Sequence, residues 1–500
     1  MLFSSPLYGA FLFAVFACHW LLKDRRLARL LFLVAVSYGF YFYGTLEAAW
    51  DAKELGNPVP FGEYPWATLC LAVIFLGSSL DFWIGKKLAK TENPRARKAL
   101  LLASVLYYLG ILAVFKYFNF FVDSFVDLFA LGGVAVKPVH LRLVLPFGIS
   151  FFTFETMSYT IDVYRKEIEP AQRYLDYLLF VCFFPHLVAG PIVRPQYMLP
   201  QLERAPVFDP KQQTEGLWLI ATGMAKKVIL GDTLQVNLVK MVFGNPERFS
   251  GLENLVAVYA YALYIYANFS GYTDVARGSA KLLGFELPLN FDAPYVAKNL
   301  QEFWHRWHIS LSTWLRDYLY KPLGGSRGTS FFTYRNLFLT MLLGGFWHGA
   351  KWTFVIWGVL HGVALAVTRI WQRWRMKDGE MPHATPIGNV VSTVLTFHYV
   401  CFAWIFFNAD SLAVAKLMLV RIGTAGFGTT QLATPGGYKV LAGIAVGLAI
   451  HFVPKGWEDR VRDLFVRAPV VVQGVLLAAA AVAVHLAAGA KVQPLIYGQF

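Results

Sequence analysis

Charged residues are scarce in this chain. Asp, Glu, Lys and Arg make up 15% of its 500 residues, against about 25% in an ordinary soluble domain. Apolar stretches recur along almost the whole sequence, so no polar block is long enough to form a separate soluble domain. Hydrophobic residues reach 57%. The composition therefore predicts an all-α, polytopic membrane protein with residues 1–500 in a single membrane-embedded domain.

Cysteine is also rare, and its spacing argues against a metal site while giving no information about the redox compartment. The four cysteines all lie in apolar stretches without metal-like spacing and are interpreted as core residues: Cys18, Cys70, Cys182 and Cys401. The chain likewise lacks the glycine patterns of Walker and Rossmann nucleotide sites and the G-x-S-x-G motif of soluble hydrolases. These absences argue against an ATPase, a dehydrogenase and a soluble-type hydrolase.

The formal net charge is +14, and the positions of the basic residues indicate the membrane topology. Basic residues gather in short runs between apolar segments rather than along one face of a folded domain, which argues against a nucleic-acid partner. Basic loops at residues 23–29 and 86–98 enclose a mainly acidic loop at 47–63. By the positive-inside rule the basic loops are cytoplasmic, so both termini are expected on the extracytoplasmic side of the membrane. No basic residue precedes the first apolar stretch, which argues against a cleavable signal peptide.

Two histidines in strongly apolar surroundings are the leading catalytic candidates, because an ionisable side chain is costly there. His308 lies beside Ile309-Ser-Leu-Ser312, and His348 lies between Trp347 and Gly349. An imidazole can remove a proton from a hydroxyl near neutral pH, which suits acyl transfer to an alcohol. His305 precedes His308 by three residues, a spacing that predicts neighbours on one helix. A catalytic zinc normally has three protein ligands, and no third ligand has suitable spacing, so no metal is expected.

Other polar residues in apolar segments have less specific interpretations. Asp274 and Arg277 have the i, i+3 spacing of a helical ion pair. Cations near the histidine motif would suit the phosphates of an acyl donor, although a headgroup-facing role fits them equally: Arg306, Arg316, Lys321 and Arg327. Pro185 and Pro191 flank His186 and Gly190, a pattern that predicts a broken helix.

Several long motifs together resemble the membrane-bound O-acyltransferase family, in particular its bacterial branch that acetylates exported polysaccharides such as alginate. The matched motifs, spread over most of the chain, are Leu145-Pro-Phe-Gly-Ile-Ser-Phe-Phe-Thr-Phe154, Phe184-Pro-His-Leu-Val-Ala-Gly-Pro191, Asn268-Phe-Ser-Gly-Tyr-Thr-Asp274, Phe303-Trp-His-Arg-Trp-His-Ile-Ser-Leu-Ser-Thr-Trp-Leu-Arg-Asp-Tyr-Leu-Tyr320 and Gly344-Gly-Phe-Trp-His-Gly349. The resemblance implies a ring of transmembrane and re-entrant helices around a central tunnel. It also implies that His348 is the catalytic histidine and His308 the second histidine of the active site.

The resemblance extends to the substrate path and the partners. Residues 490–500 resemble an extracytoplasmic tail in which a tyrosine carries the acyl group, and Tyr497 matches that tyrosine, although Gly498 replaces an expected aromatic residue. The implied donor is acetyl-CoA or another cytoplasmic thioester, with no bound cofactor. The implied partners are an SGNH-type extracytoplasmic polysaccharide acetyltransferase and membrane lipid. Candidate tunnel or substrate-binding residues within the matched motifs are Trp304, Trp307, Trp347, Asn268, Asp274, Arg306 and Asp317.

The sequence leaves two alternative functions open. The same chemistry would serve another cargo or acceptor, either D-alanine for teichoic acid or acetyl for peptidoglycan. A transporter or flippase for a lipid-linked sugar would use the histidines as a proton relay. The interrupted segments do not pair between the two halves of the chain, which weakens the transporter interpretation.

Overall fold

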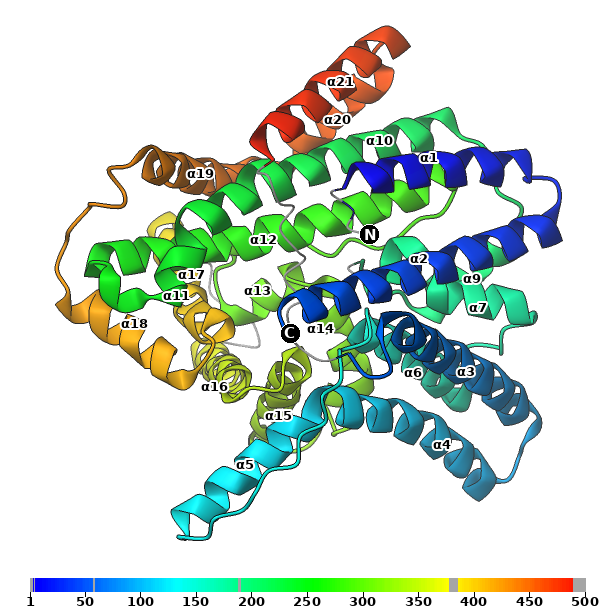
Figure 1. Cartoon of the computed structure of the whole chain (residues 1–500), viewed down its shortest axis with the longest axis horizontal. Coiled ribbons are helices and arrows are strands. Elements are labelled where there is room, and N and C mark those ends of the chain that lie inside the picture. Colours follow the sequence, from blue (N-terminus) through cyan, green and yellow to red (C-terminus); the bar gives the residue numbers. More distant parts are fainter. Residues whose placement is uncertain (1–2, 4, 57–58, 188–189, 377–384, 489–500) are drawn as a thin grey trace. The chain divides into compact units, whose positions relative to one another are not determined.

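The computed structural model describes residues 3, 5–56, 59–187, 190–376 and 385–488. Within these ranges every regular element is a helix, which confirms the predicted all-α class (Figure 1). The chain divides into two compact units, each described by itself below. Unit 1 comprises residues 1–216 and 276–287, and unit 2 comprises residues 217–275 and 288–500. The long helices α10 (Pro210–Met224) and α12 (Gly251–Leu282) each contribute residues to both units.

Unit 1 begins with long helices and continues with shorter ones. Its elements are α1 (Pro6–Leu21), α2 (Arg26–Glu54), α3 (Glu63–Lys90), α4 (Pro94–Leu112), η1 (Ala113–Tyr117), α5 (Phe118–Leu131), α6 (Ile149–Arg165), α7 (Tyr174–Cys182), α8 (Phe184–Leu187) and α9 (Pro195–Glu203). Helix α3 packs against α2, α4, α6 and α7. The start of α4 follows from its sequence, because Asn93 Oδ1 accepts hydrogen bonds from the amides of Arg95 and Ala96 at 2.9 and 3.3 Å and Pro94 suits the first helical position.

Unit 2 combines short irregular helices with long apolar ones. Besides most of α12, its elements are η2 (Ala225–Asp232), η3 (Gln235–Val239), α11 (Lys240–Gly244), η4 (Pro246–Arg248), η5 (Pro294–Val296), α13 (Leu300–Arg306), α14 (Ile309–Leu315), η6 (Arg316–Tyr320), α15 (Ser330–His348), α16 (Trp352–Arg375), α17 (Pro386–Asn408), α18 (Leu412–Thr424), α19 (Pro435–Phe452), α20 (Lys455–Arg467) and α21 (Val470–Ala487). Helix α16 packs against α13, α15, α17 and α18. The two histidine motifs therefore belong to the same unit.

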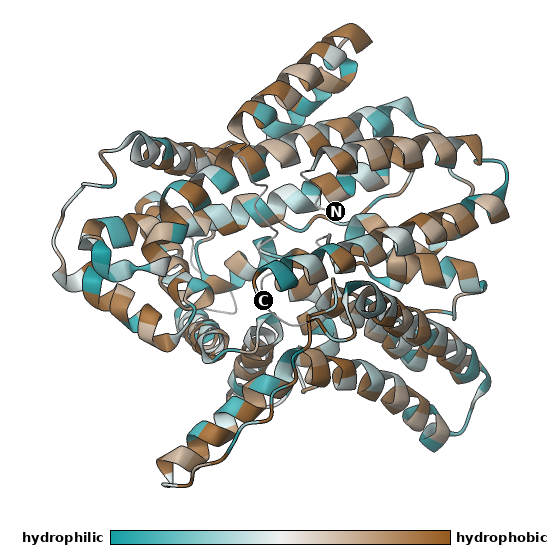
Figure 2. Ribbon diagram, in the orientation of Figure 1, coloured by the Kyte–Doolittle hydropathy of each residue, from teal (hydrophilic) through white to brown (hydrophobic). Residues whose placement is uncertain are grey.

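Among the described residues, seven helices are long and apolar enough to cross a membrane: Arg26–Glu54, Glu63–Lys90, Pro94–Leu131, Trp352–Arg375, Pro386–Asn408, Pro435–Phe452 and Val470–Ala487. Hydrophobic residues predominate along these helices, whereas the α1–α2 and α3–α4 connections are hydrophilic (Figure 2). The lengths and composition confirm a multi-pass membrane protein. The ring of helices around a tunnel, the single domain and the orientation of the termini stay predictions.

The helix break predicted around Pro185 is present in unit 1. Helix α7 ends at Cys182, and only one helical turn, α8, follows. His186 is fully buried, and its Nδ1 lies 3.0 Å from Glu155 Oε1 on α6. The same carboxyl oxygen accepts a hydrogen bond of 2.9 Å from the amide of Val193, beyond the break. The buried carboxyl group of Glu155 thus pairs with polar groups on both sides of the helix break, the His186 ring and the Val193 amide.

Close packing between α15 and α16 depends on two glycines in unit 2. A Cβ atom on Gly345 would lie 2.8 Å from Gly358 Cα, and one on Gly358 would lie 2.6 Å from the carbonyl oxygen of Met341. Real Cβ atoms do not approach backbone so closely, so only glycine permits this helix separation. Since α15 ends at His348, the contact also fixes the position of that residue.

We expect Gly358→Ala to lower the stability of the protein by about 1–3 kcal/mol, because the added methyl group forces α15 and α16 apart. Gly423→Ala on α18 is the matched control, since a Cβ there meets nothing within 4 Å and alanine favours a helix by up to about 1 kcal/mol. The melting temperature of the detergent-solubilised protein, followed by intrinsic fluorescence, compares the two variants. Equal melting temperatures for both would contradict the packing argument.

Candidate functional site

The turn that carries His308 joins two short helices. Asn299 caps α13, because its Oδ1 accepts a hydrogen bond of 2.9 Å from the Glu302 amide. Helix α13 ends at Arg306 and α14 starts at Ile309, so the prediction that His305 and His308 share one helix is wrong. The backbone leaves the helix between them and re-enters it after His308. His305 is consequently exposed while His308 is fully buried.

His308 has a backbone conformation that is rare for a residue with a side chain. Its φ and ψ are 42° and 56°, in the left-handed region, which costs a non-glycine residue about 1 kcal/mol or more and occurs preferentially at functional sites. Asn290 holds this conformation from outside the turn. Its carbonyl oxygen accepts a hydrogen bond of 3.0 Å from the Ile309 amide. Its Oδ1 accepts from the amide and the hydroxyl of Ser310 at 3.1 and 2.9 Å.

His348 ends α15 and is enclosed by aromatic rings. Only 4% of the residue is exposed. Its ring centroid lies 5.1 Å from that of Trp357 on α16 and 5.1 Å from that of Phe407 on α17. Gly349 follows, and a Cβ at that position would overlap the ring of Phe354. The glycine therefore lets α16 approach the end of α15.

Trp347 connects the two histidines within one aromatic cluster. Its ring centroid lies 5.0 Å from that of His348 and 6.4 Å from that of His308. Phe269 on α12 approaches the other side of His308, with ring centroids 4.7 Å apart. The structure thus brings together two histidines that are forty positions apart in the sequence.

Burial decides how His308 can act on a proton. His308 lies in the turn between α13 and α14, outside the seven candidate membrane helices, and burial lowers its pKa to about 3. Its imidazole is therefore neutral across the physiological range. A general base works best when its pKa lies near the operating pH, so His308 suits hydrogen bonding and orientation better than proton removal.

The sequence analysis missed a further histidine of this aromatic cluster, His361 on α16. It is fully buried, and its Nδ1 accepts a hydrogen bond of 3.3 Å from Trp304 Nε1. Its ring centroid lies 4.6 Å from that of Trp357, so it belongs to the same cluster as His348. The signal in the sequence was its place four residues after Trp357, on the same helical face.

A cavity of about 430 Å³ opens beside this cluster in unit 2. Trp304 belongs to both, because it lines the cavity and donates to His361. The lining combines apolar side chains with hydroxyl and cationic groups: His305, Ser312, Thr313, Arg316, Met341 and Arg369. Its volume is within the range of about 300–1,000 Å³ typical of small-molecule sites.

The remaining predicted tryptophan is buried, and two of the polar candidates are engaged in ion pairs. Trp307 is 1% exposed and its ring stacks on Phe303 at 5.7 Å. Arg306 binds Glu302 at 2.9 Å and Asp292 at 3.6 Å. Asp317 accepts from Arg316 at 2.9 Å and from Lys321 at 2.7 Å. Arg306 and Asp317 therefore hold local backbone and neighbouring side chains together.

The other predicted candidates lie on α12 or outside the described residues. Asn268 is fully buried on α12. Asp274 forms an ion pair with Lys226 of η2, a partner that the sequence did not indicate, while the Nε of Arg277 donates to the Leu287 carbonyl at 3.4 Å. Tyr497 lies outside the described residues.

The model of the membrane-bound O-acyltransferase family matches residues 140–408, which is over half of the chain. The chain belongs to this family. The match includes both histidine motifs and the broken helix of unit 1. This membrane-bound O-acyltransferase is therefore an enzyme, as the resemblance implied. The family assignment favours acyl transfer over the transporter alternative.

Named relatives of this O-acyltransferase act on different acceptors. The chain is 38% identical over 436 residues to the probable alginate O-acetylase AlgI of Pseudomonas aeruginosa, covering 86% of this chain and 76% of the relative. It is 33% identical over 466 residues to the peptidoglycan O-acetyltransferase of Helicobacter pylori, covering 86% and 82%. For the teichoic acid D-alanyltransferase of Bacillus subtilis, identity is 30% over 288 residues, covering 54% and 70%.

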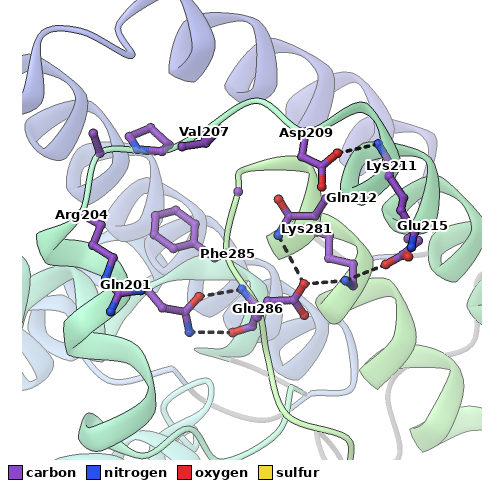
Figure 3. A pocket seen from close by; sticks show the side chains of 13 residues that line it. Gln201, Arg204, Val207, Asp209, Lys211, Gln212, Glu215, Lys281, Phe285 and Glu286 are labelled. Atoms are coloured by element: carbon purple, nitrogen blue, oxygen red, sulfur yellow. Dashed lines mark hydrogen bonds and ion pairs between the residues drawn. The ribbon is translucent and has the colours of Figure 1, made fainter.

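A second cavity, of about 530 Å³, lies in unit 1 of the acyltransferase (Figure 3). Lys281 Nζ lies 3.0 Å from Glu215 Oε2 and 2.6 Å from Glu286 Oε1. The side chain of Gln201 holds the backbone of Glu286 through hydrogen bonds of 2.8 and 3.1 Å. Because two carboxylates flank Lys281, this cavity is a weaker candidate for an anionic donor than the cavity beside the histidines.

We expect Asn290→Ala to lower the rate of acyl transfer, because the turn that holds His308 loses both hydrogen bonds to Oδ1. Each bond lost from a buried group costs about 1–3 kcal/mol. Ser310→Ala removes only the hydroxyl bond and should have a smaller effect. Acyl-transfer assays and melting temperatures of the two variants check this order. Wild-type rates for Asn290→Ala would refute the role of Asn290 in positioning His308.

Proposed function

We propose that this protein moves an acetyl group from a cytoplasmic thioester, acetyl-CoA, across the membrane for O-acetylation of an exported polysaccharide. An alginate-like or other cell-surface glycan is the proposed acceptor. The similarity to the alginate O-acetylase and the peptidoglycan O-acetyltransferase supports an acetyl cargo. No bound cofactor is needed, because the thioester itself supplies the activated acyl group.

One observation carries the mechanism: His308 and His348 belong to one buried aromatic cluster beside a cavity with cationic lining. His348 acts as the general base and removes the proton of the acceptor hydroxyl. The hydroxyl oxygen then bonds to the thioester carbonyl carbon, the carbon–sulfur bond breaks, and the thiol leaves with a proton. His308 assists as a neutral hydrogen-bonding group. General base catalysis contributes about 10²–10⁴-fold to the rate.

The cavity beside the cluster is the proposed entrance for the donor. Arg316 and Arg369 line it, and guanidinium groups of this kind bind the phosphates of coenzyme A. Trp304, Trp307 and Trp347 provide an apolar path, as an acetyl thioester requires. Asn268, Asp274, Arg306 and Asp317 hold the surrounding elements in place, and no metal takes part.

The proposed acceptor side lies outside the cytoplasm. Both termini are placed there by the positive-inside rule, in a bacterial inner membrane. Residues 490–500 form a tail in which Tyr497 receives the acetyl group and passes it to an SGNH-type extracytoplasmic transferase. Residues 1–500 work as one membrane-embedded domain in contact with lipid.

Peptidoglycan is a second candidate acceptor. The similarity to the Helicobacter pylori peptidoglycan O-acetyltransferase, which extends over 86% of this chain, favours it specifically. The D-alanyl alternative has less support, because the similarity to the teichoic acid D-alanyltransferase covers 54% of this chain. Incubating membranes with each polymer and labelled acetyl-CoA distinguishes the acceptors.

We expect His348→Ala to lower acetyl transfer by about 10²–10⁴-fold, because the acceptor hydroxyl loses its general base. The purified protein is incubated with isotope-labelled acetyl-CoA, and transfer is followed by intact and peptide mass spectrometry. His398→Ala is the matched control, since His398 is an exposed histidine on α17 outside the cluster. Unchanged transfer in His348→Ala at the wild-type protein level would refute the assignment.

We expect Tyr497→Phe to abolish labelling of the protein itself while leaving donor binding unchanged, because only the phenolic oxygen is lost. Peptide mass spectrometry after incubation with labelled acetyl-CoA locates the acetyl group. If the phenylalanine variant still passes label to the glycan at the wild-type rate, Tyr497 is not the carrier and transfer is direct.

A further inference from the structure

The cavity of unit 1 shown in Figure 3 has no part in the proposed acyl transfer. Its volume of about 530 Å³ is within the range typical of small-molecule sites. Three segments line it: the end of α9 with the connection to α10, the first turns of α10, and the end of α12 with the residues that follow. All of these residues belong to unit 1. The cavity is therefore built by one compact unit.

The charged side chains that line this cavity balance one another. Three of them are cationic and three are anionic: Arg204, Lys211 and Lys281, and Asp209, Glu215 and Glu286. A lining with no net charge favours neither a free anion nor a free cation. A zwitterionic ligand, in contrast, complements charges of both signs.

Two carboxylates and one ammonium group form the negative part of the lining. Lys281 Nζ lies 3.0 Å from Glu215 Oε2 and 2.6 Å from Glu286 Oε1, so this group has one negative charge in excess. Gln201 holds the backbone of Glu286 through hydrogen bonds of 2.8 and 3.1 Å. Gln212 Nε2 donates to Glu286 Oε1 at 3.3 Å. The carboxylates are thus held in place to accept a second ammonium group.

Arg204 provides the positive part of the lining. Phe285 lies between Arg204 and the group formed by Glu215, Lys281 and Glu286 (Figure 3). Charges of opposite sign are therefore set apart along the cavity, as the two ends of a zwitterion require. A guanidinium group binds a phosphate through two parallel hydrogen bonds, so a phosphate suits the Arg204 end.

The cavity lies beside the end of an apolar helix. A Cβ atom on Gly284, which lines the cavity, would lie 3.6 Å from the ring of Trp20 near the end of α1. Trp20 packs edge-on against Phe208, with ring centroids 5.0 Å apart, and tryptophan is enriched at the boundary between membrane and water. Val207 lines the cavity and is 76% exposed, and Phe208 is 50% exposed. Exposed apolar side chains at a charged cavity suit a lipid headgroup whose chains stay in the membrane.

We propose that this cavity binds the phosphoethanolamine group of a membrane lipid. The primary ammonium group donates to Glu215 and Glu286, the phosphate accepts from Arg204, and the acyl chains lie along Val207 and Phe208. Phosphatidylcholine has the same phosphate, but its quaternary ammonium group has no N–H to donate. The bound headgroup joins the α9–α10 connection to the end of α12, so it stabilises the folded protein by mass action.

The full-length protein is delipidated in detergent and melted in mixed micelles that contain phosphatidylethanolamine or phosphatidylcholine with the same acyl chains. For the wild type we expect phosphatidylethanolamine to give the larger, saturable rise in melting temperature, by on the order of a few degrees. Glu286→Gln should lose this preference, because the ammonium group loses a carboxylate. Glu203→Gln makes the same change at an exposed position on α9 and should retain it. Arg204→Ala should weaken the response to both lipids.

Native mass spectrometry of the wild-type protein keeps the proposal testable even if a variant fails to fold. Retention of phosphatidylethanolamine in preference to phosphatidylcholine supports the site. Equal retention and equal melting temperatures with the two lipids overturn it. A rise of the same size with water-soluble phosphoethanolamine alone assigns the cavity to a soluble ligand and overturns the lipid as its source. None of these readouts uses acyl transfer, so their outcome is independent of the proposed function.

Discussion

Polar groups in the apolar interior of this protein must find partners within the protein, because lipid hydrocarbon offers none. The constraint explains why the turn at His308 and the broken helix are each tied to a buried polar side chain. Asn290 satisfies the amides that follow His308, and Glu155 binds both His186 and the Val193 amide. At these two departures from regular helix, a buried side chain thus replaces missing backbone hydrogen bonds.

Glycine and tryptophan have complementary effects around His348. Gly345, Gly358 and Gly349 bring α15 and α16 into backbone contact at the end of α15. Trp347 and Trp357 then fill the space on either side of the imidazole. A large rigid ring has few rotamers to lose on burial, so the cluster fixes the histidine at a small entropic cost. The same rings exclude water, which strengthens every electrostatic interaction of the imidazole with a reacting group.

The sequence predicted the elements whose signals are local. Apolar length predicted a polytopic helical protein, and Pro185 and Pro191 predicted the break. The two histidine motifs contain residues whose rings both lie near that of Trp347. Long-range partners had no local signal: Asn290 holds the His308 turn from 18 positions away. The i, i+3 spacing of His305 and His308 was misleading, because the pattern assumes a continuous helix and the left-handed backbone at His308 interrupts it.

That interruption of the helix gives His305 and His308 different surroundings. A continuous helix would place His305 and His308 on one face, with similar exposure. The left-handed turn instead buries His308 against Phe269 and Trp347 and leaves His305 at the cavity. Burial keeps His308 neutral, so it hydrogen-bonds without carrying charge into the apolar interior. The left-handed backbone of one residue thus separates an exposed histidine at the cavity from a buried, neutral histidine in the aromatic cluster.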